Sequence, residues 1–155
     1  MSDNIQLLKD QIDNNVLLTI HCGIIIEKED KILLQRKAGE TNWHIPGGTM
    51  ILGEKYQETA VRGVLEETAL TVENMQLFGI HSGRECFVTY KNGKKGFNLQ
   101  VIFYATEYTG KVKIKDSHNR EHRFFKKNNL PKNLNPVQKG FIMDWKNNEQ
   151  IPIVN

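Results

Sequence analysis

The segment from Gly47 to Leu70 constrains the fold of this chain more than any other, because a glycine-rich loop there gives way to an amphipathic pattern. After the two glycines at 47 and 48, apolar residues recur at helical spacing between about residues 56 and 68. These residues are Ala60, Val61, Val64 and Leu65. An arginine and several glutamates lie off that stripe. The pattern predicts a loop followed by a helix that packs through one face and presents charge on the other.

Runs of β-branched and aromatic residues predict a sheet around this helix. The expected strands cover residues 16–27, 32–37, 75–81, 85–90, 97–108 and 121–125. A polar turn at 28–31 joins the first two as a hairpin, although it contains no Asn-Gly pair. An Asn-Gly turn at 92–93 separates two of the later strands. The chain therefore alternates short turns with strands on both sides of the central helix.

Two further helices are predicted near the ends of the chain. Ile5, Leu8 and Ile12 share one face of a short helix at 4–13. A C-terminal helix at about 136–147 begins with Asn135 as its N-cap and Pro136 in its first turn. Neither a repeat nor a low-complexity linker interrupts the 155 residues, which is a length typical of one domain. We expect a single α+β domain over residues 1–155, in which helices cover a mixed sheet.

Composition narrows the class of partner. The net charge is +3, and the lysines are scattered or lie in turns without interleaved aromatic residues. This favours a small anionic ligand over a nucleic acid track. Cys22 and Cys86 lack the spacing of a metal or redox motif, and no signal-peptide or membrane-spanning pattern is present. These features predict a cytoplasmic protein with no membrane partner, and the β-rich segments permit a homodimer.

The charged face of the central helix is suited to a metal ion. Positions 63, 66 and 67 are three and four residues apart, so they project from one face. Glu66 and Glu67 place two carboxylates there, and Arg62 lies one turn before Glu66. Mg²⁺ prefers oxygen ligands, and hydrolysis of a diphosphate needs its phosphate charge neutralised. The alternative interpretation of paired glutamates is a solvated acidic helix face.

The spacing of this segment resembles that of the Nudix hydrolase family, G-x5-E-x7-R-E-U-x-E-E-x-G-U, where U is apolar. The matching positions are Gly48, Glu54, Arg62, Val64, Glu66, Glu67 and Leu70. Trp43, Pro46 and Gly47 before them are also similar to the family's approach to the motif. Two positions depart from it: Gly63 replaces the first Glu after the Arg, and Ala69 replaces the last Gly.

The resemblance implies an α/β/α sandwich and Mg²⁺-dependent hydrolysis, with Mn²⁺ as an alternative ion, of a nucleoside diphosphate linked to another group. By the same resemblance, Glu66, Glu67 and the Gly47 carbonyl hold the metal, and Gly48 allows close approach of the backbone to substrate. Glu54 braces the loop and Arg62 orients the catalytic glutamates. Which nucleoside diphosphate derivative is the substrate is left open by the sequence.

Other residues are weaker candidates. Glu121 is expected to activate water, with Asp116 and His118 as alternatives, and a surface strand residue is the competing interpretation. Arg36 ends a strand and could contact phosphates, or it could simply be solvated. Trp43 could stack on a base, or it could belong to the core.

Gly63 is the main conflict within the motif. It removes an acid, and a glycine inside a helix costs about 1 kcal/mol relative to alanine. Ala69 costs roughly 1 kcal/mol if the helix ends in the left-handed conformation. The loss of the acid raises a second hypothesis, a catalytically impaired Nudix-fold module that binds or senses a nucleotide.

Overall fold

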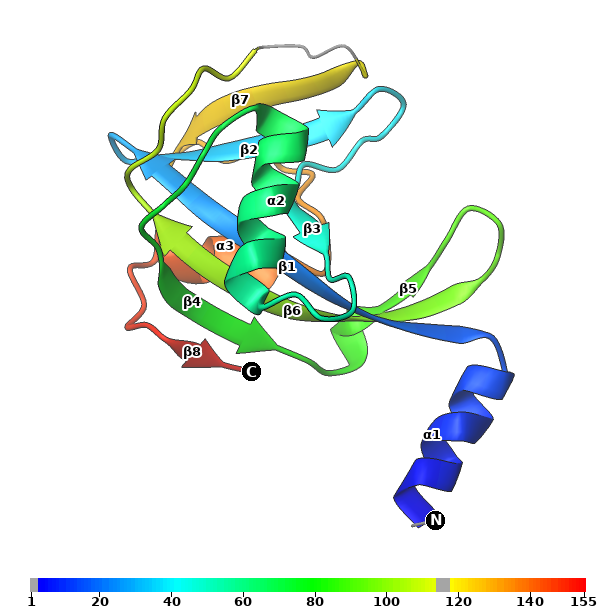
Figure 1. Ribbon diagram of the computed structural model, residues 1–155. Coiled ribbons are helices and arrows are strands. Elements are labelled where there is room, and N and C mark those ends of the chain that lie inside the picture. The colour runs from blue at the N-terminus through cyan, green and yellow to red at the C-terminus, as the bar shows by residue number, and fades with distance from the viewer. Residues whose placement is uncertain (1–2, 114–117) are drawn as a thin grey trace.

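A mixed sheet with helices on both faces forms the body of the protein (Figure 1). The computed structural model describes residues 3–113 and 118–155. The helices are α1 (Asp3–Asp13), α2 (Tyr56–Thr68) and α3 (Lys139–Lys146). The strands are β1 (Val16–Lys28), β2 (Lys31–Lys37), β3 (Gly47–Thr49), β4 (Gln76–His81), β5 (Phe87–Thr89), β6 (Lys95–Ala105), β7 (Arg120–Lys126) and β8 (Ile153–Val154).

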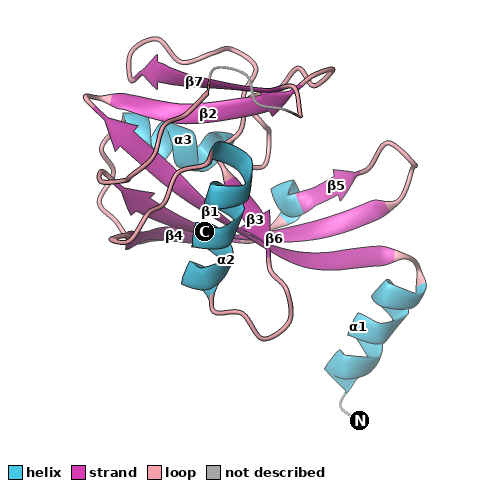
Figure 2. Cartoon of the chain, turned by 45° about the horizontal axis from the view of Figure 1, so that its top comes forward, coloured by secondary structure: helices cyan, strands magenta, loops and turns pink. Residues whose placement is uncertain are grey.

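The sheet follows the order β7-β2-β1-β6-β4-β8, with β3 paired to β1 and β5 paired to β6. β1 is its central element because it runs parallel to β6 over 16–26 and antiparallel to β2 over its last two residues. β2 then continues with β7 as a separate antiparallel ribbon (Figure 2). The β2–β7 ribbon consequently diverges from the rest of the sheet.

The core forms two layers, one on each face of β1. Cys22, Ile24 and Ile26 pack with the apolar face of α2, whereas Ile25 packs with α3. Because successive side chains of a strand point to opposite faces, both layers bury the same strand. This explains why residues 22–26 form a continuous buried run without polar side chains, and it confirms the predicted α+β sandwich.

The C-terminal helix begins later than the predicted residue 136. The Asn135 side chain accepts a hydrogen bond from the Val137 amide at 2.9 Å, and its carbonyl accepts from the amides of Gln138 and Lys139. These bonds make an opening turn, and the regular helix starts only at Lys139. The N-terminal helix begins at Asp3, one residue before the expected start, and the central helix covers the expected residues. Among the described residues, the helices are all too short or too polar to traverse a lipid bilayer.

The end of α2 allows a test of local strain. Ala69 has φ 62° and ψ 15°, so it keeps the left-handed conformation that glycine usually supplies. We expect Ala69→Gly to stabilise the protein by about 1 kcal/mol, because an alanine Cβ is crowded in that conformation. Urea denaturation of the two proteins would measure the gain, and an unchanged or lower midpoint would contradict it.

Candidate active site

Gly63 is the point at which α2 touches the glycine loop. A Cβ added at residue 63 would lie 2.3 Å from both the Gly47 carbonyl carbon and the Gly48 nitrogen, and 2.6 Å from the Gly47 oxygen. The Gly48 position is also tight, since a Cβ there would lie 3.1 Å from the Gly63 Cα. The helix therefore packs directly on the backbone of β3. The glycine that seemed unfavourable from local propensity is required by this contact.

Glu54 ties the loop after β3 to the helix. Its carboxylate accepts hydrogen bonds from Arg62 Nε at 2.6 Å, the Thr59 hydroxyl at 2.7 Å and the Ile51 amide at 3.0 Å. These bonds, led by that from Arg62, lower the pKa of Glu54 to about 2. Arg62 also donates to the Thr49 carbonyl at 2.9 Å. Glu54 and Arg62 together fix both ends of the loop against α2.

The two glutamates at the other end of α2 differ in environment. Glu66 has a 62% exposed side chain, with Arg62 3.3 Å away. Glu67 is more buried, and its Oε2 atom lacks a hydrogen-bond partner among the described residues. Burial raises the pKa of Glu67 to about 7, although Arg120, Lys37 and a backbone hydrogen bond from Gly47 act in the opposite direction. The ionised Glu67 therefore carries charge that its protein neighbours do not fully compensate.

These oxygens fit a hard divalent cation. The unpartnered Glu67 Oε2 is buried beside the Gly47 backbone, and Glu66 is next to it in sequence and open to solvent. Over residues 3–113 and 118–155, no group of three or more acidic, His or Cys side chains is arranged to hold a metal. The protein ligands would thus be two carboxylates and a main-chain oxygen. Such a sparse set suits Mg²⁺, which usually keeps several waters.

Glu121 does not join these carboxylates. Its neighbours in β7, Arg120 and His122, both reach the Glu67 carbonyl oxygen, at 3.2 and 2.9 Å. Glu121 pairs instead with Arg36 at 3.1 Å and Arg123 at 3.0 Å. Because strand side chains alternate, Glu121 points away from the face that contacts α2. Glu121 thus forms ion pairs on the face of β7 opposite α2, its expected role in activating water stays a prediction, and Asp116 lies outside the described residues.

Arg36 and Trp43 lie together, away from the carboxylates. The Arg36 guanidinium is 4.5 Å from the centre of the Trp43 ring, and Phe125 meets that ring edge-on at 4.8 Å. Trp43 is only 3% exposed. Trp43 belongs to the core, and Arg36 is engaged by Trp43 and Glu121. The expected contacts of this pair with substrate stay predictions.

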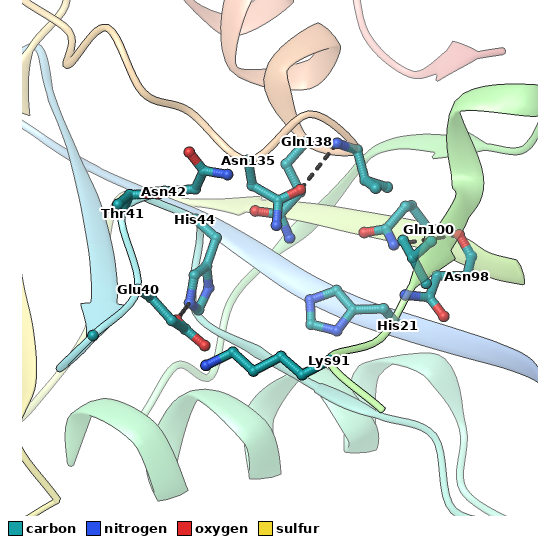
Figure 3. A pocket seen from close by; sticks show the side chains of 13 residues that line it. His21, Glu40, Thr41, Asn42, His44, Lys91, Asn98, Gln100, Asn135 and Gln138 are labelled. Atoms are coloured by element: carbon teal, nitrogen blue, oxygen red, sulfur yellow. Dashed lines mark hydrogen bonds and ion pairs between the residues drawn. The ribbon is translucent and has the colours of Figure 1, made fainter. Parts of the chain in front are cut away.

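A polar cavity of about 460 Å³ lies on the α3 side of β1 (Figure 3). His21 and Gln100 each present a buried side-chain atom, Nε2 and Oε1, with no hydrogen-bond partner among the described residues. Burial and the neighbouring His44 lower the pKa of His21 to about 4, so its ring is neutral. Asn98 and Asn135 also line the cavity. Two polar atoms are thus available to a ligand.

The same two cations influence the Glu67 carboxylate and the polar cavity. The positive charges of Lys37 and Arg120 lower the pKa of Glu67. They also lower the pKa of His44, which lines the cavity. A hypothetical Cβ on Gly47 would lie 3.0 Å from the His21 Nε2 atom, so the glycine loop separates the two regions. Sequence reasoning missed this cavity. Its signal was the pair Asn98 and Gln100, two polar residues at alternate positions of an otherwise apolar strand.

Comparisons with known proteins agree with this geometry. The family model described as the NUDIX domain matches residues 18–145. This chain belongs to the Nudix family. It is 32% identical over 128 residues to an ADP-ribose pyrophosphatase of Methanocaldococcus jannaschii, covering 79% of this chain and 72% of that protein.

Solved structures show the same fold. A MutT protein from Bacillus halodurans is 31% identical with a TM-score of 0.57, over 71% of this chain and 69% of that chain. A MutT Nudix hydrolase from Burkholderia pseudomallei has a TM-score of 0.67 at 20% identity, over 81% of this chain and 96% of that chain. The second likeness supports the fold alone.

Proposed function

We propose that this protein hydrolyses the pyrophosphate bond of a nucleoside diphosphate linked to a further group, with Mg²⁺ held by Glu66, Glu67 and the Gly47 carbonyl. The chain is an enzyme of the Nudix pyrophosphohydrolase class. The observation that carries the proposal is the buried, unpartnered Glu67 Oε2 beside the Gly47 backbone. Mn²⁺ would satisfy the same oxygen ligands.

Each group of site residues has its own role in the proposed reaction. A divalent cation bound at the glutamates would neutralise phosphate oxygens and lower the pKa of a bound water. Glu54 and Arg62 hold the loop and Glu66 in place. The positive charges of Lys37 and Arg120 lower the pKa of both Glu67 and His44, and the same charges would attract the phosphates of a substrate. Electrostatic stabilisation of phosphate charge is the main requirement of this reaction.

The cavity is assigned to the organic part of the substrate. His21 Nε2 and Gln100 Oε1 would hydrogen-bond a neutral polar group, which relieves the cost of burying them unpaired. The relative from Methanocaldococcus jannaschii is named for ADP-ribose, a diphosphate with a polar group at each end. We therefore place ADP-ribose first among the substrates to be tried.

Gly63 supports a second candidate, a module that binds the nucleotide without turnover. No side chain at residue 63 could supply the acid of the motif in this packing, because any Cβ meets the Gly47 and Gly48 backbone. The residues of the cavity and Glu67 would still bind ligand. Activity and binding must therefore be measured together.

The test uses the purified full chain with ADP-ribose, in Mg²⁺, in Mn²⁺ and in EDTA. Release of AMP that requires the metal supports hydrolysis. Binding of ADP-ribose by calorimetry without release of AMP, in either metal, supports the sensing module and contradicts the enzyme proposal. A panel of sugar nucleotides and nucleoside triphosphates treated in the same way would define the substrate.

The cellular compartment is a smaller part of the proposal. Cys22 and Cys86 are both free and buried in this structure. Unpaired thiols are typical of proteins in a reducing compartment. We propose the cytoplasm on this ground, and fractionation of cells that express the chain from its own gene would test it.

A further inference from the structure

The carboxyl end of α2, where Glu67 lies, is held by strand β7. The last carbonyl groups of a helix have no partner within the helix, and the helix dipole makes this end negative. The Glu67 carbonyl is one of these groups. It accepts hydrogen bonds from His122 Nε2 at 2.9 Å and from Arg120 Nη1 at 3.2 Å. These two side chains of β7 therefore fix the main chain of Glu67.

His122 is buried between two carbonyl oxygens. Its ring is 4% exposed, with Nε2 on the Glu67 oxygen and Nδ1 at 2.9 Å from the Lys113 oxygen. A ring nitrogen can only donate to a carbonyl, and a neutral imidazole has one N–H to give. The Glu67 oxygen is the stronger acceptor, because it lies at the negative end of the α2 dipole. We therefore expect Nε2 to carry the proton that His122 donates to Glu67.

The position of the Glu67 main chain decides where its carboxylate lies. That carboxylate accepts a backbone hydrogen bond from Gly47, and its Oε2 atom has no hydrogen-bond partner among the described residues. Arg62 and Glu54 hold α2 to the loop after β3 at an earlier turn of the helix. A shift of the last turn would move the carboxylate relative to the Gly47 backbone. Misplacement of a reacting group by about 1 Å can slow a reaction about 100-fold.

We propose that His122 is a positioning residue for Glu67, in which the Nε2–H group holds the Glu67 carbonyl and so keeps the Glu67 carboxylate in place for a divalent cation. The inference rests on the proposed function, because it takes Glu67 as a ligand of the metal. His122 does not line the polar cavity, so it should not affect how the organic part of the substrate binds.

Two substitutions separate the two ring nitrogens. The amide nitrogen of glutamine can take the place of Nε2, and that of the shorter asparagine can take the place of Nδ1. His122→Gln therefore keeps a donor for the Glu67 carbonyl, whereas His122→Asn keeps one only for the Lys113 carbonyl. Loss of a hydrogen bond that orients a metal ligand typically lowers metal affinity by about 10- to 100-fold.

The first measurement is the binding of Mn²⁺ alone, by electron paramagnetic resonance. We expect affinity to fall about 10- to 100-fold in His122→Asn and to stay close to that of the parent in His122→Gln. The second measurement is hydrolysis of ADP-ribose at saturating Mn²⁺. There kcat should fall in His122→Asn while KM is unchanged, and His122→Gln should restore kcat.

Unchanged Mn²⁺ affinity in His122→Asn overturns the proposal, even if urea denaturation shows a loss of stability, because His122 would then only cap the helix. Equal weakening in both variants also overturns it, since the ring itself would be responsible. If His122→Asn fails to fold, His122→Gln decides: parent-like Mn²⁺ binding supports the proposal and weakened binding overturns it.

Failure of the proposed function gives a different result. The Mn²⁺ affinities of the variants would follow the expected pattern, but the parent would release no AMP from ADP-ribose. The positioning role of His122 would then be supported in a protein that binds metal without hydrolysis. A parent that binds no Mn²⁺ overturns both this inference and the metal site proposed above.

Discussion

Replacing Glu67 with glutamine is expected to abolish metal-dependent hydrolysis and, at the same time, to raise the thermal stability of the metal-free protein. The loss of activity should be about 100-fold or more, because the uncharged amide cannot match the electrostatic role of the carboxylate. The gain in stability follows from the pKa of Glu67, which folding raises from 4.5 to about 7.

The sign of the stability change is fixed by that pKa. A carboxyl whose pKa is higher in the folded state favours folding when protonated, so its contribution to stability falls as the pH rises from about 4.5 to about 7. Above that range Glu67 is ionised and the full cost is present. Glutamine carries no such cost. The melting temperature of Glu67→Gln in EDTA should therefore exceed that of the parent by several degrees at pH 8 and converge with it at pH 4.5.

Addition of Mg²⁺ should affect the parent and Glu67→Gln differently. Mg²⁺ should raise the melting temperature of the parent, because a ligand that binds only the folded state stabilises it. The same addition should have little effect on Glu67→Gln. The matched control is Glu121→Gln, which removes a carboxylate on the other face of β7 and should leave both hydrolysis and the Mg²⁺ response unchanged. Full activity in Glu67→Gln would exclude this carboxylate from the reaction.

Gly63→Ala is the second large effect. Helix propensity alone predicts that alanine stabilises a helix interior by about 1 kcal/mol. The structure predicts the opposite sign, because the new methyl would lie 2.3 Å from backbone atoms of Gly47 and Gly48. Overpacking of this kind typically costs 1 to 3 kcal/mol, so we expect a net loss of about 2 kcal/mol in urea denaturation.

Gly140 in α3 provides the control for that experiment. It is also a helical glycine, but a Cβ there would meet nothing within 4 Å. Gly140→Ala is therefore expected to stabilise by up to about 1 kcal/mol. If both substitutions stabilised the protein, the close contact between α2 and β3 would be disproved. Gly63→Glu carries the same clash and a larger side chain, so a loss of activity in it would not report on chemistry alone.

The sequence alone predicted those elements whose structure follows from the local spacing of apolar residues. The apolar stripe of α2 located the helix, and the apolar run 16–26 anticipated a strand, which is fully buried over residues 22–26. Residues whose role depends on tertiary contacts were harder. Trp43 became a core residue through its contact with Phe125, which is distant in sequence.

Register explains why the sequence could not place the Glu121 side chain. A shift of one residue in a strand moves a side chain to the opposite face, and no feature of the β7 sequence fixed that register in advance. Arg120 and His122, which were not among the predicted site residues, are the residues that reach the Glu67 carbonyl. The sequence also could not predict why residue 63 is a glycine, because the reason is the close approach of α2 to the Gly48 backbone, 15 residues earlier in the chain.

The contact of Gly63 with Gly47 and Gly48 restricts how this protein could be re-engineered. The three positions behave as one unit, since a side chain at residue 63 needs the loop to stand farther from the helix. Transplanting only the helix of a relative that carries the motif's acid would force that side chain into the loop backbone. A functional graft would have to exchange loop and helix together.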